Sequence, residues 1–208
     1  MNHNHSLNEL DILKELGNIG AGNAATALSQ LLNKEINMNV PMAKVVNFNE
    51  MMELIGGSER PVAAVFLRME GEITGSLFFV LSLEDATRLI NHLIPDRDLH
   101  VGNLPSHELG LSALQELGNI VSAHYLTALS ECIGMIVTPS VPQVTIDMVG
   151  AIVMTGLLEI SQVSDHAIFI DTELIETAEK QLEKAKGHFF LVPNPDSFEK
   201  ILKALGAR

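Results

Sequence analysis

The sequence of 208 residues lacks features that mark exported and membrane proteins. Cys132 is its single cysteine, which excludes an internal disulfide and is typical of a reducing compartment. No run approaches the roughly 18 apolar residues of a transmembrane helix. The N-terminus MNHNHSLNEL has neither the basic nor the apolar region of a signal peptide. We therefore expect a cytoplasmic protein without a membrane span.

Basic residues are also scarce. The chain has 13 lysines and arginines against 26 aspartates and glutamates, for a formal net charge of −13. Proteins that bind nucleic acids need clustered basic side chains to contact phosphates, so this charge argues against a nucleic-acid partner. Apolar residues make up 47% of the chain, enough for a folded core.

The usual patterns of covalent catalysis and nucleotide binding are missing too. No Ser–His–Asp or Cys–His arrangement stands out that would supply an activated nucleophile. The segment GNIGAG at 17–22 has its glycines in the order G-x-x-G-x-G, and no strand precedes it. It therefore does not fit a dinucleotide-binding loop.

Hydrophobic periodicity predicts two successive sets of helices and strands. The capping box of Ser6 and Glu9 marks the start of the first helix. The first set is a helix over 7–33, a strand after Pro41, a short helix ending at Gly56, a hairpin turning at 70–72, and a helix from Ser82 to Pro95. The second set is a helix over 106–133, a strand over 135–146, strands near 149–160 and 164–171, a charged helix over 172–185, a strand over 188–193 and a helix after Pro195.

The two sets are related by a repeat. Residues 15–32 and 116–133 share nine of 18 positions, including ELGNI and TALS, and Pro41 matches Pro142 at the same offset of 101. A constant offset across a helix and a strand is hard to obtain by chance. We expect an α/β (α+β type) fold in which two pseudo-two-fold related halves share one β-sheet with long helices packed on it. The expected division is one domain over 1–208, with repeats at 7–95 and 106–208 and a linker at 96–105.

Each repeat carries the same polar pattern: an acid or hydroxyl, a glutamate four residues later, an asparagine three residues later, and a proline 22 residues further on. The members are Asp11, Glu15, Asn18 and Pro41 in the first copy, and Ser112, Glu116, Asn119 and Pro142 in the second. Spacings of four and three place the three helical members on one helix face.

Glutamate and asparagine cannot act as nucleophiles here, but the amide can hold a water molecule in a fixed orientation and the carboxylate can pair with a lysine. Such a site is suited to a hydrolysis whose electrophile and metal come from another protein, and phosphoryl transfer depends strongly on orienting the attacking water. A solvated helix face, or a relic of duplication in one copy, is the alternative.

This duplicated pattern resembles the CheC family of chemotaxis phosphatases. The resemblance extends over the whole chain, through ELGNIGAGNAATALSQLL, FLRMEGEITGSLFFV, SVPQVTIDMVGA and DSFEKILKALGA. It implies dephosphorylation of the response regulator CheY, whose aspartyl phosphate lies beside a bound Mg²⁺, with no cofactor of the chain's own. It also implies binding of the deamidase CheD and a fold similar to CheX and flagellar-switch proteins.

The resemblance further assigns roles to the repeated residues. Asn18 and Asn119 would orient the attacking water, and Glu15 and Glu116 would pair with a lysine of the regulator. The remaining members would support the docking face or shape the chain beside it: Asp11, Ser112, Pro41 and Pro142. A binding module for CheD or the flagellar switch is the rival function. We expect a monomer, because the chain already contains the two halves that a CheX-like dimer would supply.

Overall fold

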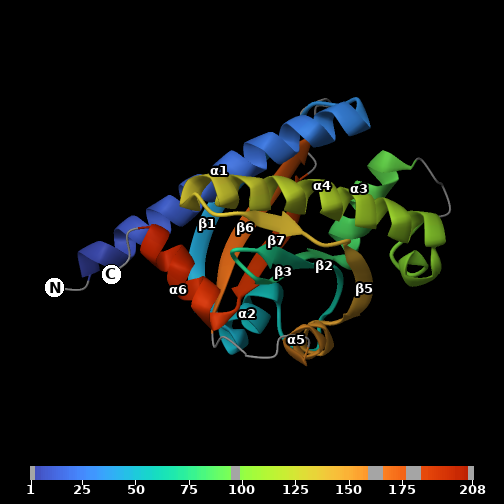
Figure 1. Cartoon of the computed structure of the whole chain (residues 1–208). Helices are drawn as coiled ribbons and strands as arrows, with labels where there is room; N and C mark the ends of the chain where they lie inside the picture. The colour runs from blue at the N-terminus through green and yellow to red at the C-terminus, as the bar shows by residue number, and fades with distance from the viewer. Residues whose placement is uncertain (1–2, 95–98, 159–165, 177–183, 206–208) are drawn as a thin grey trace.

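The computed structural model describes residues 3–94, 99–158, 166–176 and 184–205 (Figure 1). The first half contains α1 (His3–Leu32), β1 (Ile36–Asn47), α2 (Phe48–Ile55), β2 (Pro61–Gly71), β3 (Gly75–Ser82) and α3 (Leu83–Leu93). The second half contains η1 (Leu104–Ser106), α4 (Glu108–Ile133), β4 (Val137–Pro139), β5 (Gln143–Met148), α5 (Val149–Leu158), β6 (His166–Glu176), β7 (Lys184–Pro193) and α6 (Pro195–Ala204). The expected mixture of helices and strands is confirmed.

All strands belong to one antiparallel sheet with the order β1-β6-β7-β3-β2-β4, and β5 also pairs with β2. The order is symmetric between the two halves, because the edge strands of each half pair with the hairpin of the other. Strand β1 pairs with β6, and strands β4 and β5 pair with β2. Val45 of β1 pairs with Ile168 of β6, and Ile146 of β5 pairs with Ala63 of β2. Val45 and Ile146, which are 101 residues apart, therefore hold equivalent places. The descent of this repeat from a duplication stays a prediction.

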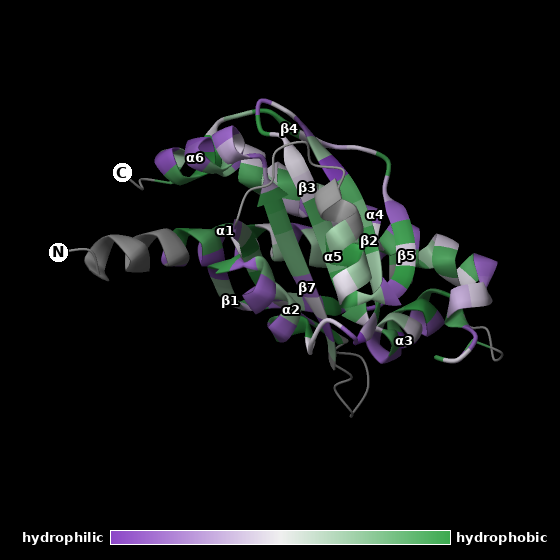
Figure 2. Cartoon of the chain, turned by 90° about the horizontal axis from the view of Figure 1, so that it is seen from below, coloured by the Kyte–Doolittle hydropathy of each residue, from purple (hydrophilic) through white to green (hydrophobic). Residues whose placement is uncertain are grey.

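Helices cover both faces of the sheet. Long helices α1 and α4 lie side by side on one face and run in opposite directions, while α2 and α5 lie on the other face (Figure 1). Leu13, Leu117 and Ile170 belong to the larger apolar cluster, beneath α1 and α4. Met51 and Val153 belong to the smaller one, beneath α2 and α5. Figure 2 views this second face, where the strands are mostly hydrophobic.

Several predicted elements are confirmed together with their local signals. The hairpin of β2 and β3 turns where expected. Ser82 caps α3 by accepting a hydrogen bond from the Asp85 N–H at 3.0 Å, which satisfies a donor that the helix leaves free. The first predicted helix is α1, but it begins at His3 and not beside the capping box, so Ser6 lies inside its first turns.

The strand predicted over 149–160 is wrong, because Val149–Leu158 forms helix α5. Val149, Ile152 and Val153 are buried at spacings of three and four, as one face of a helix requires, and they pack in the cluster beneath α2. The residues of α2, shifted by 101, fall on this segment. The β-branched residues suggested a strand, and packing against the sheet face overrides that preference.

The charged helix predicted over 172–185 is also wrong within the described residues. Thr172 and Leu174 are buried and alternate with half-exposed residues along β6, and Lys184 and Ala185 already belong to β7. Burial with a period of two is the mark of a strand that packs one face against a core. Residues 177–183 lie outside the described residues.

The segment before α4 contributes to the core, although residues 95–98 of it lie outside the described residues. Leu99 and Leu104 are buried in the cluster beneath α1 and α4. The His107 Nδ1 then accepts a hydrogen bond from the Gly110 N–H at 2.9 Å and caps α4. Within the described parts of the chain, no helix is long and apolar enough to cross a membrane.

Candidate functional site

The first copy of the polar pattern lies along one face of α1. Asp11 and Glu15 are exposed and Asn18 is half-buried, while Leu13 and Leu16 between them point into the core. Helical spacing thus presents the three polar side chains along one side of α1, as the sequence predicts. Neither Asp11 nor Glu15 has a hydrogen-bond or ion-pair partner among the described residues.

Asn18 is connected to the edge strand β1 beside Pro41. The pairing of β1 with β6 slips between Asn39 and Met42, and proline has no N–H to donate to a ladder. Because Val40 also falls in this interruption, its N–H is free of the ladder and donates to Asn18 Oδ1 at 3.1 Å. One acceptor of the Asn18 amide is thereby used, and its NH₂ group has no partner among the described residues.

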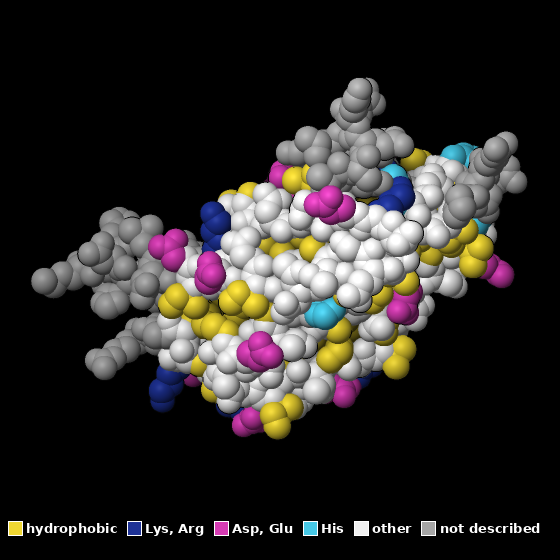
Figure 3. All heavy atoms as spheres, turned by 90° about the horizontal axis from the view of Figure 1, so that it is seen from above, with side chains coloured by type: hydrophobic (Ala, Val, Ile, Leu, Met, Phe, Trp, Pro, Cys, Tyr) yellow, Lys and Arg dark blue, Asp and Glu magenta, His cyan; other side chains and the backbone are white. Residues whose placement is uncertain are grey.

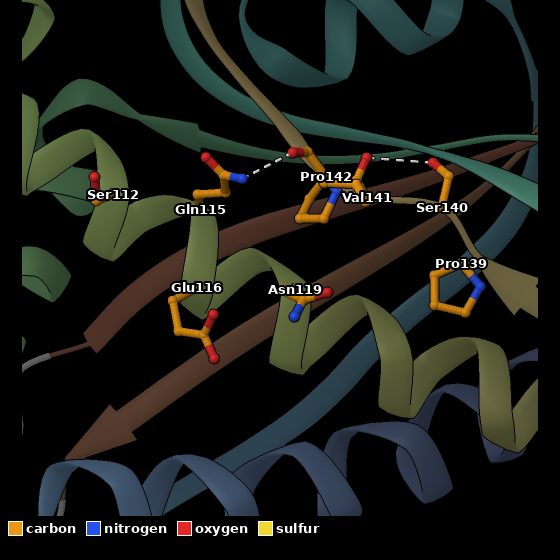
Figure 4. Close-up of a pocket in the computed structure, with 8 residues that line it drawn as sticks. All are labelled: Ser112, Gln115, Glu116, Asn119, Pro139, Ser140, Val141 and Pro142. Carbon is orange, nitrogen blue, oxygen red and sulfur yellow. Dashed lines mark hydrogen bonds between the residues drawn. The ribbon is translucent and has the colours of Figure 1, made fainter.

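The second copy lies on α4 and opens into a depression of about 560 Å³. Figure 4 shows the residues that line it: Ser112, Gln115, Glu116, Asn119, Pro139, Ser140, Val141 and Pro142. Ser112 and Glu116 are exposed and Asn119 is half-buried, like their counterparts on α1. Within the part of the chain that the structure describes, the side chains of Glu116 and Asn119 have no hydrogen-bond partner. All four members of the second pattern therefore meet at one open depression.

The wall opposite α4 is formed by residues 140–142, between β4 and β5. Ser140 is fixed to β2, because its N–H donates to the Arg68 carbonyl at 2.9 Å and its Oγ accepts from the Arg68 N–H at 2.9 Å. Gln115 Nε2 donates to the Pro142 carbonyl at 3.0 Å (Figure 4). Pro142 is buried, whereas Pro41 in the first copy is exposed. The two prolines thus shape their sites differently.

The glycine of each ELGNI motif brings its helix close to the sheet. A Cβ added to Gly118 would lie 2.5 Å from the nearest atom of Val65 on β2. A Cβ added to Gly17 would lie 3.1 Å from Val40 and 3.3 Å from Ile170. Hydrogen in place of a side chain lets the strand residues press against the helix one position before each asparagine. The motif therefore combines a packing residue with polar residues directly beside it.

The chemistry available at both rows is limited to orientation and hydrogen bonding. An amide can hold water and a carboxylate can accept hydrogen bonds or pair with a cation, but neither can form a covalent intermediate in these surroundings. No group of three or more His, Cys, Asp or Glu side chains among the described residues is arranged to hold a metal ion. The helix face that carries both rows has scattered carboxylates with apolar side chains between them (Figure 3).

The sequence identifies the repeated residues but misses Gln115, Ser140 and Val141. The hydrogen bond of Gln115 reaches a carbonyl 27 residues away, and the Ser140 hydroxyl bonds to Arg68, 72 residues away. Neither contact leaves a local spacing in the sequence. The same offset of 101 gives only their counterparts, of which Lys14 replaces Gln115.

Comparisons with known proteins agree on one family. Residues 9–45 and 109–146 both match the CheC-like family. The CheY-P phosphatase CheC of Bacillus subtilis (strain 168) is 47% identical over 199 residues, which cover 96% of this chain and 94% of that protein. The flagellar motor switch phosphatase FliY of the same organism is 29% identical over 136 residues, which cover 65% of this chain and 35% of that protein.

Among solved structures, Thermotoga maritima FliY superposes with a TM-score of 0.75 at 22% identity, covering 95% of this chain and 96% of that one. At this identity the likeness concerns the fold alone, a mixed sheet-and-helix architecture that extends over nearly the whole of both chains.

Proposed function

Because the chain belongs to the CheC-like family, we propose that it is a phosphatase that hydrolyses the aspartyl phosphate of the chemotaxis response regulator CheY. The observation that carries this proposal is the 47% identity, over nearly the full length of both chains, to a CheY-P phosphatase. The two exposed Glu–Asn rows supply groups of the kind that this reaction needs.

In this mechanism the regulator brings the electrophile and the metal. Its phosphorylated aspartate and bound Mg²⁺ dock against one of the two helix rows. Asn18 or Asn119 then holds the attacking water in line with the phosphorus atom, and Glu15 or Glu116 pairs with a lysine of the regulator. The structure supports these roles, because both glutamates are exposed and both asparagines keep an unpartnered NH₂ group among the described residues.

The other members of the pattern serve the docking face. Asp11 and Ser112 lie one helical turn before the glutamates, at the near end of each row, and both are exposed. Pro41 and Pro142 lie beside the asparagines and shape the chain there. Binding to the deamidase CheD, a monomeric state and a cytoplasmic location complete the proposal as predicted from the sequence.

The decisive experiment follows the decay of radiolabelled phospho-CheY with substoichiometric protein. We expect Asn18→Ala and Asn119→Ala each to leave a measurable acceleration of phospho-CheY decay. With the double variant, phospho-CheY should decay at its own uncatalysed rate. Asn23→Ala is the matched control, because Asn23 is an exposed amide on α1 outside the pattern. Far-UV circular dichroism must show unchanged helix content, because both asparagines are half-buried and Asn18→Ala removes the acceptor of the Val40 N–H, a loss of about 1 kcal/mol.

Adding a chelator tests whether the required metal belongs to the regulator or to this chain. Removing Mg²⁺ should abolish the acceleration without changing the unfolding midpoint of the phosphatase, since the proposed metal belongs to the substrate. If the unchanged protein does not accelerate decay at all, the phosphatase proposal is refuted and the binding module for CheD or the flagellar switch takes its place.

A further inference from the structure

The two sites differ in the exposure of the residue before the proline. Val141, beside Pro142, is 79% exposed and lines the depression of the second site. Val40, its counterpart at the offset of 101, is 2% exposed and belongs to the core. The same residue type thus has opposite environments in the two copies.

The difference follows from how each edge strand passes its helix. In the first copy β1 continues as one strand past the proline, although its pairing with β6 slips between Asn39 and Met42. Val40 packs against α1 at Gly17 while its N–H bonds to Asn18. In the second copy the strand is divided into β4 and β5. No bond joins Asn119 to Val141 among the described residues, and Val141 faces outward between the two strands.

The exposed valine is nevertheless held in place. Gln115 fixes the carbonyl of Pro142 on one side, and Ser140 is bonded to β2 on the other. The Ser140 Oγ also donates to the Val141 carbonyl at 3.3 Å (Figure 4). The counterpart of Gln115 is Lys14, an exposed side chain that makes no hydrogen bond to the Pro41 carbonyl among the described residues. The wall is therefore a feature of the second site.

An isolated exposed valine needs no explanation, but this one lies on the rim of a depression with two unpartnered polar groups. Bonds on both sides of the valine restrain its backbone before anything docks, so little ordering entropy is lost when it is covered. We propose that Val141, positioned by Gln115, is an apolar contact through which the second site binds a phosphorylated receiver domain, and that the first site binds without it.

This inference rests on the proposed function, and it specifies the partner's chemistry. The receiver domain must present an apolar side chain next to its phosphorylated aspartate, where Val141 meets it when Asn119 enters the phosphorylation site. The first site lacks an exposed valine at this position, and Met42, 38% exposed, is the nearest large apolar side chain beyond its proline. The two sites therefore bind the same substrate through different contacts.

The test measures binding of CheY activated with beryllofluoride and Mg²⁺, in variants that keep one site. Glu15→Ala/Asn18→Ala leaves the second site, and Glu116→Ala/Asn119→Ala leaves the first. With only the second site intact, Val141→Asp should raise Kd about tenfold or more, as expected for losing the burial of one valine. The conservative variant Val141→Ile should keep the original Kd.

With only the first site intact, Val141→Asp should leave Kd unchanged. Gln115→Ala should raise Kd of the second site about twofold to threefold through a looser wall, and Lys14→Ala, its matched control, should change neither site. In phosphatase assays with the second site alone, Val141→Asp should raise KM and leave kcat within about twofold, because the contact positions the substrate without touching the reacting atoms.

Three results would overturn the inference: an unchanged Kd at the second site, an equal rise at both sites, or a fall in kcat at constant KM. A loss of self-association in sedimentation of Val141→Asp would instead assign the valine to a contact between copies. The proposed function fails separately, when neither single-site variant nor the unchanged chain accelerates the decay of phospho-CheY.

Discussion

The glycine of the repeated ELGNI motif allows a stability prediction that distinguishes the two copies. A Cβ at Gly118 would lie 2.5 Å from Val65 Cγ2 and 2.7 Å from both Cβ and Cγ1. At Gly17 the closest atom, Val40 Cγ1, is 3.1 Å away. Since carbon atoms pack best at about 3.5–4.0 Å, alanine overlaps severely at Gly118 and only slightly at Gly17.

The magnitude follows from two opposing terms. Alanine stabilises a helix interior by about 1 kcal/mol relative to glycine, and overpacking a core costs about 1–3 kcal/mol. Val65 is fully buried in β2, and its Cβ is part of the overlap, so rotating its side chain cannot relieve the clash. The upper end of the cost applies, and Gly118→Ala should lower the free energy of unfolding by about 2 kcal/mol.

Two glycines of α1 provide comparison values for this change in stability. Gly17→Ala should fall within about 0.5 kcal/mol of the unchanged protein, because the small overlap offsets the gain in helix propensity. At Gly22 an added Cβ meets no atom within 4 Å and the position is exposed, so alanine there should stabilise by about 0.5–1 kcal/mol. Urea unfolding followed by circular dichroism measures all three, provided that the m-values agree.

The reasoning is refuted if Gly118→Ala is as stable as Gly22→Ala. A double-mutant cycle checks the cause of any loss. Shortening Val65 to alanine removes the overlapping methyl groups, so Gly118→Ala should cost at least 1 kcal/mol less in the Val65→Ala background, by about the relieved overlap. An unchanged cost would exclude the methyl groups of Val65 as the cause, since alanine keeps the Cβ that lies 2.7 Å from the added atom.

Two further predictions concern polar side-chain pairs, one buried and one half-buried. Tyr125 Oη lies 3.0 Å from Thr172 Oγ1, and burial raises the pKa of the tyrosine, so Tyr125→Phe should lower the free energy of unfolding in urea by about 1–2 kcal/mol at neutral pH, with Thr172→Val in that background recovering most of it. His188 Nδ1 lies 3.1 Å from Asp171 Oδ1 and lowers the pKa of that carboxyl. The resulting stability is present above the pKa of an unfolded aspartate, about 3.9, and is lost as pH falls through the lower folded pKa, so the thermal midpoint of Asp171→Asn should fall less steeply below about pH 4.

The local part of the candidate site could be predicted from the sequence. Glu15 and Asn18 lie on one exposed face because their spacing of three fits a helix, and the second ELGNI copy shows that the pattern is repeated. Hairpin β2–β3 and the cap at Ser82 were predictable for the same reason, since their signals lie within a few residues of one another.

Features that depend on packing could not be predicted in this way. The run of α5 contains Val149, Ile152 and Val153, which fit a short strand or a buried helix equally well until the sheet face that they cover is known. The offset of 101 pointed to the correct answer, because α2 shifted by this number falls on α5. The repeat was stronger evidence there than residue preference.

The hairpin of the second half was hidden for a different reason. Val45 of β1 pairs with Ile168 of β6, and its counterpart Ile146 of β5 pairs with Ala63 of β2. The offset is therefore 101 residues between β1 and β5 but 105 residues between β2 and β6. Residues inserted between these elements shift the register of the repeat. A comparison at one fixed offset therefore loses the second half beyond α5, where glutamates and lysines suggest a helix.

The exchanged edge strands explain why both sites need the whole chain. Asn18 is held by Val40 of β1, and β1 pairs with β6, from the other half. In the same way, the wall beside Asn119 is fixed through Ser140 to Arg68 of β2, from the first half. Each site thus combines a helix of its own half with a strand that the opposite half holds in register. A half alone would keep its Glu–Asn row and its edge strand but lose the partner strand that holds this edge strand in register, so each candidate site depends on the pair of repeats.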